Sequence, residues 1–335
     1  MTSDGLTSDN FPLSSLNFET GAAHPRPDGG TCAINCTTLL NRIEAFARAS
    51  RSTNTHLAYK GDLAAFQAWG GTLPATPLMV AAYLAEHADT LSVATLKRRL
   101  AAISSAHQSH QLSNPVTAGL VRATLRGIAR TRGRPAQAAT PLLRDDLFKV
   151  LDRFANASAK NSRDRALLLT GFAGWFRRSE LIGLDVADLE FASQGVIATV
   201  RHSKTDQRSA GQQVAIPYGS TTHCPVQALQ CWLQMLATDT GALFRPINRH
   251  GAISNERLSA AAVSNIIKKR LAAADINPIG YSAHSLRSGF ATSAAIAGTP
   301  LWKIRMQTRH ATNKGVARYI RPNGMFKQNA AADVL

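Results

Sequence analysis

The stretch GFAGWFRRSEL, residues 171–181, joins the end of one apolar segment to the start of another and indicates the fold around it. An apolar segment runs to Gly174, and two arginines then precede Ser-Glu-Leu. Ser179 and Glu180 are suited to the first turn of a helix, where a side-chain oxygen accepts from free N–H groups and a negative charge is favoured. We therefore expect a helix, a turn with an arginine pair, and a second helix. A surface arginine pair beside an ordinary helix cap is the alternative.

Periodic apolar residues extend this pattern to both sides. Helices are expected at about 144–156, 162–174, 224–237, 258–274 and 283–297. Two short stretches, 195–200 and 213–217, look like strands on either side of the polar loop HSKTDQRSAGQ. Lys204 lies in this loop, where a flexible ammonium group can reach into a site. A solvent-exposed turn lysine is the plainer interpretation of the same residue.

The N-terminal part of the chain has a different organisation. Residues 131–141, TRGRPAQAATP, are rich in Pro, Gly, Ala and Thr and are typical of a linker. Before them, five helices are expected, beginning with an apolar face at 39–47 and ending with 116–130. The first residues contain few large apolar side chains, so we expect a mobile arm. The expected segments are an arm (1–34), a helical domain (35–131), a linker (132–141) and a second, larger domain (142–335).

Charge is the strongest property of the whole chain. Its 335 residues carry 38 Lys and Arg against 21 Asp and Glu, a net charge of +17. Residues 1–35 contribute −3, residues 36–135 contribute +8 and residues 136–335 contribute +12. A broad positive field of this kind favours a polyanion, because binding to phosphates releases counterions. Solubility charge is the alternative, but nucleic acid is the expected partner.

Particular basic residues are candidates for DNA contact in the N-terminal domain. Arg122, Arg126 and Arg130 follow each other at intervals of four and so share one face of a helix. A solvated basic face would have the same spacing, and the charge of the whole region favours DNA-backbone contact. The complete candidate set is Lys97, Arg98, Arg99, Arg122, Arg126, Arg130, Arg132 and Arg134.

The apolar runs, the N-terminal residues and the cysteines bear on where the protein resides and on whether it binds zinc. No run of 18 apolar residues is present, and the N-terminus has neither the basic nor the apolar region of a secretory signal. Neither pair among Cys32, Cys36, Cys224 and Cys231 has the spacing of a zinc site, so we expect reduced thiols. Cytosolic residence is the expectation from these features, and no zinc site is expected.

Several polar residues in the C-terminal half are weak signals when taken singly. His284 and Arg287 are three residues apart, so a helix would place them side by side, where they can grip one phosphate. His310 follows in Thr-Arg-His, and Tyr319 comes nine residues later. The alternative for Tyr319 is a packing role, which is the usual one for a single tyrosine.

In this order, Arg177, Glu180, Lys204, His284, Arg287, His310 and Tyr319 resemble the active-site series of the tyrosine recombinase (phage integrase) family. The resemblance runs from about residue 36 to the C-terminus and includes SKTDQ and CPVQALQCWL. It is nearest to the Cre-type and Xer-type recombinases. It implies a mainly helical chain with a small β-sheet, made of a helical core-binding domain and a mixed α/β catalytic domain.

Two positions depart from the family pattern. Arg309 stands before His310, where the family more often has glycine. Arg177 and Arg178 compete for the first catalytic position, and Arg177 is chosen because the family's arginine stands two residues before the serine.

The resemblance also implies the chemistry, the partners and the source. The protein would be encoded by a bacterium, phage or plasmid, would be cytoplasmic and nucleoid-associated, and would need no cofactor and no metal. The two arginines and His310 would stabilise the phosphate, Tyr319 would attack it, His284 would act as base and Lys204 as general acid, while Glu180 orients the site. The expected partners are double-stranded DNA with an inverted-repeat site and three further copies of the chain, which is monomeric when free. The segment after Tyr319 would supply the subunit contact.

Three rival functions remain open. A type IB topoisomerase would use similar groups without partner subunits. A DNA-binding regulator would need no chemistry, and a metal-dependent transposase or nuclease would need paired carboxylates, which the sequence does not show as a cluster.

Overall fold

The computed structural model describes residues 24–25, 31–32, 36–133, 139–154, 158–201, 211–309, 312 and 315–316. The chain divides into two compact units, 1–136 and 137–335, each with its own hydrophobic core. The described parts are mainly helical with one small three-stranded sheet, which confirms the expected fold class. No helix among the described residues is both long enough and apolar enough to cross a membrane.

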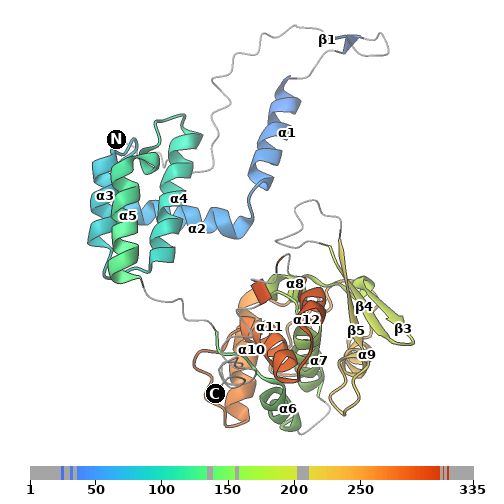
Figure 1. Ribbon diagram of the computed structural model, residues 1–335. Helices are drawn as coiled ribbons and strands as arrows, with labels where there is room; N and C mark the ends of the chain where they lie inside the picture. The colour runs from blue at the N-terminus through green and yellow to red at the C-terminus, as the bar shows by residue number, and fades with distance from the viewer. Residues whose placement is uncertain are drawn as a thin grey trace, which may run out of the picture. The chain divides into compact units, whose positions relative to one another are not determined.

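All five helices expected in the first unit are present (Figure 1): α1 (Cys36–Ala49), α2 (Thr53–Ala68), α3 (Pro77–Glu86), α4 (Val93–Ser109) and α5 (Gly119–Arg132). Their starts follow local chemistry, since the side chains of Ser52, Thr76 and Ser92 each accept a hydrogen bond from a backbone N–H of the first turn. The last helix begins three residues later than expected, because Asn114 caps a separate 3-10 turn at Pro115–Thr117.

The core of the first unit lies among α2, α3, α4 and α5, where Phe66, Tyr83, Leu96 and Ile103 are fully buried. The apolar face expected at 39–47 does form a helix, but Leu39, Ile43 and Phe46 on it stay exposed. Within the expected arm, β1 (His24–Pro25) pairs with β2 (Thr31–Cys32). The other residues of the arm lie outside the described part, so its mobility stays a prediction.

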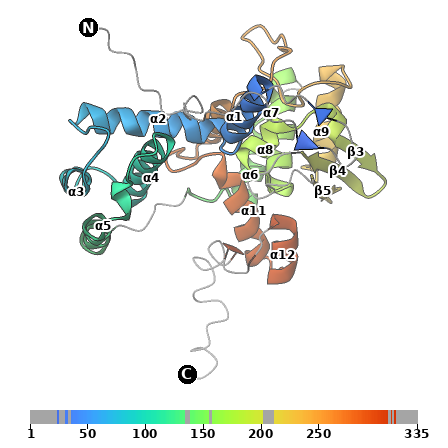
Figure 2. The ribbon, with the colours of Figure 1, turned by 90° about the horizontal axis from the view of Figure 1, so that it is seen from above.

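The second unit contains the helices α6 (Arg144–Asp152), α7 (Ala159–Ala173), α8 (Arg178–Gly183), α9 (Pro225–Leu236), α10 (Ala260–Ala273), α11 (His284–Ile296) and α12 (Leu301–Thr308). Its antiparallel sheet has the order β3 (Leu189–Ala192), β4 (Gly195–Val200), β5 (Gln212–Pro217). Figures 1 and 2 both show the sheet at one edge of the unit, beside α9. The sequence predicted β4, β5 and most of the helices but missed β3 and α12.

Close packing fixes α11 inside the second unit. The segment before α6 runs against this helix, and the N–H of Leu142 donates to the carbonyl of Ser285 at 2.9 Å. A Cβ added at Gly289 would lie 1.8 Å from the Leu142 carbonyl oxygen, so only glycine permits this approach. On its other side α11 contacts α7, whose residues Ala166–Gly171 are all buried. The first turn of α11, which carries His284 and Arg287, is therefore held rigidly.

Candidate active site

Arg177 and Glu180 meet at the start of α8, as the sequence indicated. Arg177 is the N-cap residue, and its backbone N–H donates to Glu180 Oε2 at 2.9 Å. Its guanidinium donates to Glu180 Oε1 at 2.5 Å. The expected cap is thus confirmed for Glu180, while Ser179 is exposed in the first turn of α8. Arg178 is also exposed and Arg177 is not, so the geometry favours Arg177 as the member of the cluster.

Arg287 reaches the same carboxylate from α11. Its guanidinium nitrogen lies 3.9 Å from Glu180 Oε2, and its side chain is only 6% exposed. Trp175 positions it, because the guanidinium carbon lies 3.3 Å from the centroid of the indole and the Trp175 carbonyl accepts from it at 2.5 Å. In return, the indole N–H donates to the Arg287 carbonyl at 2.8 Å. Trp175 was not predicted as a site residue, and its backbone φ of +51° cannot be read from the sequence.

A third arginine, Arg309, completes the cluster. It follows α12 directly, and its guanidinium donates to Glu180 Oε2 at 2.8 Å. The sequence marked this residue only as a departure from the family pattern, so its place in the cluster was missed.

The carboxyl group of Glu180 is ionised in this setting. Burial alone would raise its pKa, since the side chain is 1% exposed. The backbone N–H of Arg177, the charge of Arg309 and the Arg177 guanidinium outweigh burial and hold the pKa at about 2. Glu180 therefore serves as a fixed negative charge that gathers arginines from three segments of the chain.

His284 is the first residue of α11, one turn before Arg287. Partial desolvation lowers its pKa below the ordinary value, and the charge of Arg287 lowers it further. The imidazole is consequently neutral at pH 7 and able to accept a proton. Tyr281, the tyrosine nearest to His284 in sequence, has a raised pKa because of its burial and the nearby charge of Asp146, so its phenol loses a proton less readily.

Four predicted residues lie outside the described part of the chain: Arg134, Lys204, His310 and Tyr319. The segment that contains Lys204 joins β4 to β5, which pair from Val200 opposite Gln212. His310 follows Arg309 directly in sequence. The roles expected for these residues therefore stay predictions.

The described basic residues that are expected to contact DNA lie in the first unit and differ in their exposure and in the partners of their side chains. Arg122, Arg126, Arg130 and Lys97 are exposed, while Arg132 is exposed and pairs with Asp89 at 3.0 Å. Arg98 is half-exposed and forms two hydrogen bonds with the buried carboxylate of Asp62, at 2.7 and 2.9 Å. Arg99 is 16% exposed, and its guanidinium donates to the Tyr83 hydroxyl. Arg99 thus serves the interior of this unit.

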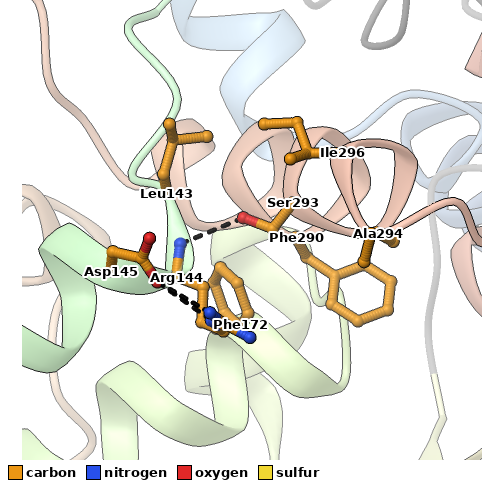
Figure 3. A pocket seen from close by; sticks show the side chains of 9 residues that line it. Leu143, Arg144, Asp145, Phe172, Phe290, Ser293, Ala294 and Ile296 are labelled. Carbon is orange, nitrogen blue, oxygen red and sulfur yellow. Dashed lines mark hydrogen bonds and ion pairs between the residues drawn. The ribbon is translucent and has the colours of Figure 1, made fainter.

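A pocket of about 400 Å³ lies elsewhere in the second unit, against the second half of α11 (Figure 3). Its lining is largely apolar, with the rings of Phe172 and Phe290 packed edge to face at 5.7 Å. At its rim the N–H of Arg144 donates to Ser293 Oγ at 3.0 Å. Its lining residues include none of the arginine cluster.

Comparison with known proteins gives consistent results. The model of the phage integrase family matches residues 142–324. An integrase/recombinase XerD homolog of Selenomonas ruminantium is 40% identical over 290 residues, covering 84% of this chain and 85% of that protein. Tyrosine recombinase XerC of Pelobacter propionicus is 27% identical over 296 residues, covering 84% of this chain and 90% of the relative.

Solved structures resemble the chain in fold. A lambda integrase dimer bound to a COC′ core site has a TM-score of 0.60 at 18% identity, covering 86% of this chain and 77% of that one. The Tn1549 transposon integrase with circular intermediate DNA has a TM-score of 0.60 at 17% identity, covering 89% and 98%.

Proposed function

Because this chain belongs to the phage integrase family and is a tyrosine recombinase, we propose that it cleaves and rejoins DNA through a 3′-phosphotyrosyl intermediate, without a metal ion or ATP. The observation that carries the proposal is the meeting of Arg177 and Arg287 on Glu180. These arginines come from segments 110 residues apart in sequence, and both hold guanidinium groups next to one buried carboxylate.

The arginine pair suits the transition state of phosphoryl transfer. Attack on a phosphodiester produces a crowded phosphorane with more negative charge on its non-bridging oxygens than the ground state has. Two planar guanidinium groups fixed near these oxygens stabilise the transition state more than the ground state. Arg287 is well suited to this task, because the indole of Trp175 and the carbonyl of the same residue fix its orientation before DNA arrives.

The proton transfers fall to the remaining residues of the series. Tyr319 attacks phosphorus, the 5′ oxygen leaves and a 3′-phosphotyrosyl bond forms. A phenol has a pKa of about 10, so it needs a base, and the lowered pKa of His284 keeps that imidazole neutral for the purpose. Lys204 protonates the leaving 5′ oxygen, and His310 donates to the phosphate. The covalent bond conserves the energy of the broken ester, so a second 5′ hydroxyl can reseal the strand.

DNA is held chiefly by the first unit in this proposal. The exposed arginines of α5 at 122, 126 and 130 form one charged face, and Lys97 on α4 is also exposed. Contacts of this kind fix the protein on the duplex without reading its sequence. Arg99 is not part of this DNA-contacting set, because its guanidinium donates to the Tyr83 hydroxyl.

Assembly on two paired sites requires four subunits, since four strands must each meet one tyrosine. The relatives of known structure include a lambda integrase tetramer bound to a Holliday junction. The C-terminal sequence MFKQNAAADVL contains apolar residues that a pocket on a second copy can accept. The largely apolar pocket at Phe172 and Phe290 is our candidate acceptor.

The test begins with sheared genomic DNA from the source organism, because the target site is unknown. The protein is incubated with the fragments in EDTA, denatured, and captured under conditions that retain covalently bound DNA alone. We expect enriched fragments that share an inverted repeat, and two such fragments should then exchange strands in a recombination assay. No covalent capture in EDTA would refute the proposal. Relaxation of a supercoiled plasmid that carries the enriched sequence, without strand exchange, would indicate a topoisomerase.

A further inference from the structure

Arg309 occupies a position where the backbone favours glycine. Its φ is +53°, in the left-handed region, and its N–H closes the last turn of α12 on the Met306 carbonyl at 3.2 Å. Such a conformation is less favourable for a residue with a Cβ atom than for glycine. Glycine would adopt this backbone conformation without strain, yet the position holds a long charged side chain. We therefore expect the reason to lie in the contacts that this side chain makes.

Those contacts lead into the catalytic cluster. The guanidinium donates to Glu180 Oε2 at 2.8 Å and, more weakly, to Gln212 Oε1 at 3.4 Å. The side chain is 13% exposed, and its Nε is buried with no hydrogen-bond partner among the described residues. Arg309 thus lies inside the site with one donor unused and one weakly used.

The ion pairs of Glu180 with described residues bring more positive than negative charge to this place. Three guanidinium groups, from Arg177, Arg287 and Arg309, lie within 4.0 Å of one carboxylate. Among these described side chains two positive charges are in excess, at a place largely shielded from water. Such an excess is unfavourable by itself and becomes favourable when an anion enters.

Residues 175–177 supply one of the three arginines and contact the guanidinium groups of the other two. Trp175 stacks beneath Arg287, and the ring of Phe176 lies beneath Arg309 with its centroid 5.8 Å from the guanidinium carbon. Arg177 follows directly and is bonded to Glu180. Arg309 therefore has an aromatic ring beside its guanidinium, as Arg287 has, and a hydrogen bond to Glu180, as Arg177 has.

We propose that Arg309 is a third phosphate-binding arginine, whose guanidinium donates to a non-bridging oxygen of the scissile phosphate together with Arg177 and Arg287. The inference rests on the proposed function of this site. In the free protein Glu180 holds the side chain ready, and its Nε and its weakly bonded NH1 supply the donors. Arg309 is thus a catalytic residue that the seven-residue series does not include.

The test compares normal DNA with DNA whose scissile phosphate is a methylphosphonate, which has no charge on its non-bridging positions. A group that neutralises this charge is needed on the first substrate and dispensable on the second. Arg309→Met removes the guanidinium, and Arg309→Gly removes it while relaxing the backbone, so loss of folding cannot explain both results. Lys149→Met on α6, a residue that pairs only with the partly exposed Asp146 at 3.6 Å among the described residues, is the charge-matched control.

The measured quantity is the ratio of wild-type to variant cleavage rate on each substrate. We expect both Arg309 variants to be slower on normal DNA by on the order of 10–100-fold, below the loss for a principal oxyanion donor. On methylphosphonate DNA the ratio should fall close to one, while Lys149→Met stays near one on both. An equal loss on both substrates, or no loss on either, would overturn the inference. Failure of the wild type to form any covalent adduct would instead overturn the proposed function.

Discussion

Replacing Glu180 by glutamine should destabilise the second unit at neutral pH and should flatten the pH dependence of its stability. The wild-type carboxylate is 1% exposed and interacts with three guanidinium groups. Glutamine has nearly the same shape but carries no charge, so the substitution removes the counterion and leaves the arginines facing one another. The effect is therefore electrostatic and must vary with pH.

The magnitude follows from the pKa of Glu180, about 2 in the folded chain against an ordinary value of 4.5. Since folding lowers the pKa, the stabilisation is fully present above pH 4.5 and is lost as the pH falls towards 2. The difference corresponds to about 3 kcal/mol at pH 7, and roughly 1 kcal/mol of it remains near pH 3. The wild type should thus lose about 2 kcal/mol over this range that Glu180→Gln does not lose.

Hydrogen exchange in increasing urea is a suitable assay, because it follows peptides of α7 and α11 separately from the first unit. Glu190→Gln on the exposed part of β3 is the matched control, as it removes one carboxylate from the same unit. The free-energy gap between wild type and Glu180→Gln should narrow from pH 7 to pH 3, and the control should show no such change. A gap of constant size would refute the electrostatic reasoning.

Three further predictions concern the cluster, the DNA contacts and the tail. Arg177→Ala should slow cleavage by on the order of 10²–10³-fold while Arg178→Ala stays close to wild type, because the Arg177 guanidinium bonds to Glu180 and Arg178 is exposed. The opposite result in a covalent-adduct assay would shift the catalytic position by one residue. Each alanine at Arg122, Arg126 or Arg130 should reduce the salt dependence of DNA binding, measured as log K against log salt, by about 1 unit of slope, and Arg99→Ala should instead lower thermal stability. Removing residues 323–335 should leave binding to one arm of the target intact and weaken cooperative filling of the second arm in a gel-shift titration, so unchanged cooperativity would place the subunit contact elsewhere.

Much of the local structure could be predicted from the sequence because the signals are local. The helix starts after Ser52, Thr76 and Ser92 each depend on a side chain that bonds to a backbone N–H three residues away. The one-turn spacing of His284 and Arg287 likewise needs no tertiary information. β3 was missed because its short sequence, LEFA, is largely exposed and depends on pairing with β4.

The candidate site was predicted in its members but not in its organisation. The residue series pointed to Arg177, Glu180 and Arg287, whereas the support by Trp175 and Phe176 depends on contacts between distant segments. Trp175 and Arg309, which also belong to the site, have positive φ values. Sequence patterns indicate a positive φ only where glycine occupies the position. Arg309 left a trace in the sequence as an arginine where the family more often has glycine.

The central claim is that Tyr319 becomes joined to the 3′ end of cleaved DNA, and mass spectrometry of the trapped adduct tests it most directly. The captured complex is digested with nuclease and protease, and the peptide that retains a nucleotide is sequenced. The account predicts a nucleotide linked through its 3′ phosphate to Tyr319, and no adduct from Tyr319→Phe that still binds the same DNA. A nucleotide on Tyr281 or another residue, or a 5′ linkage, would contradict the account.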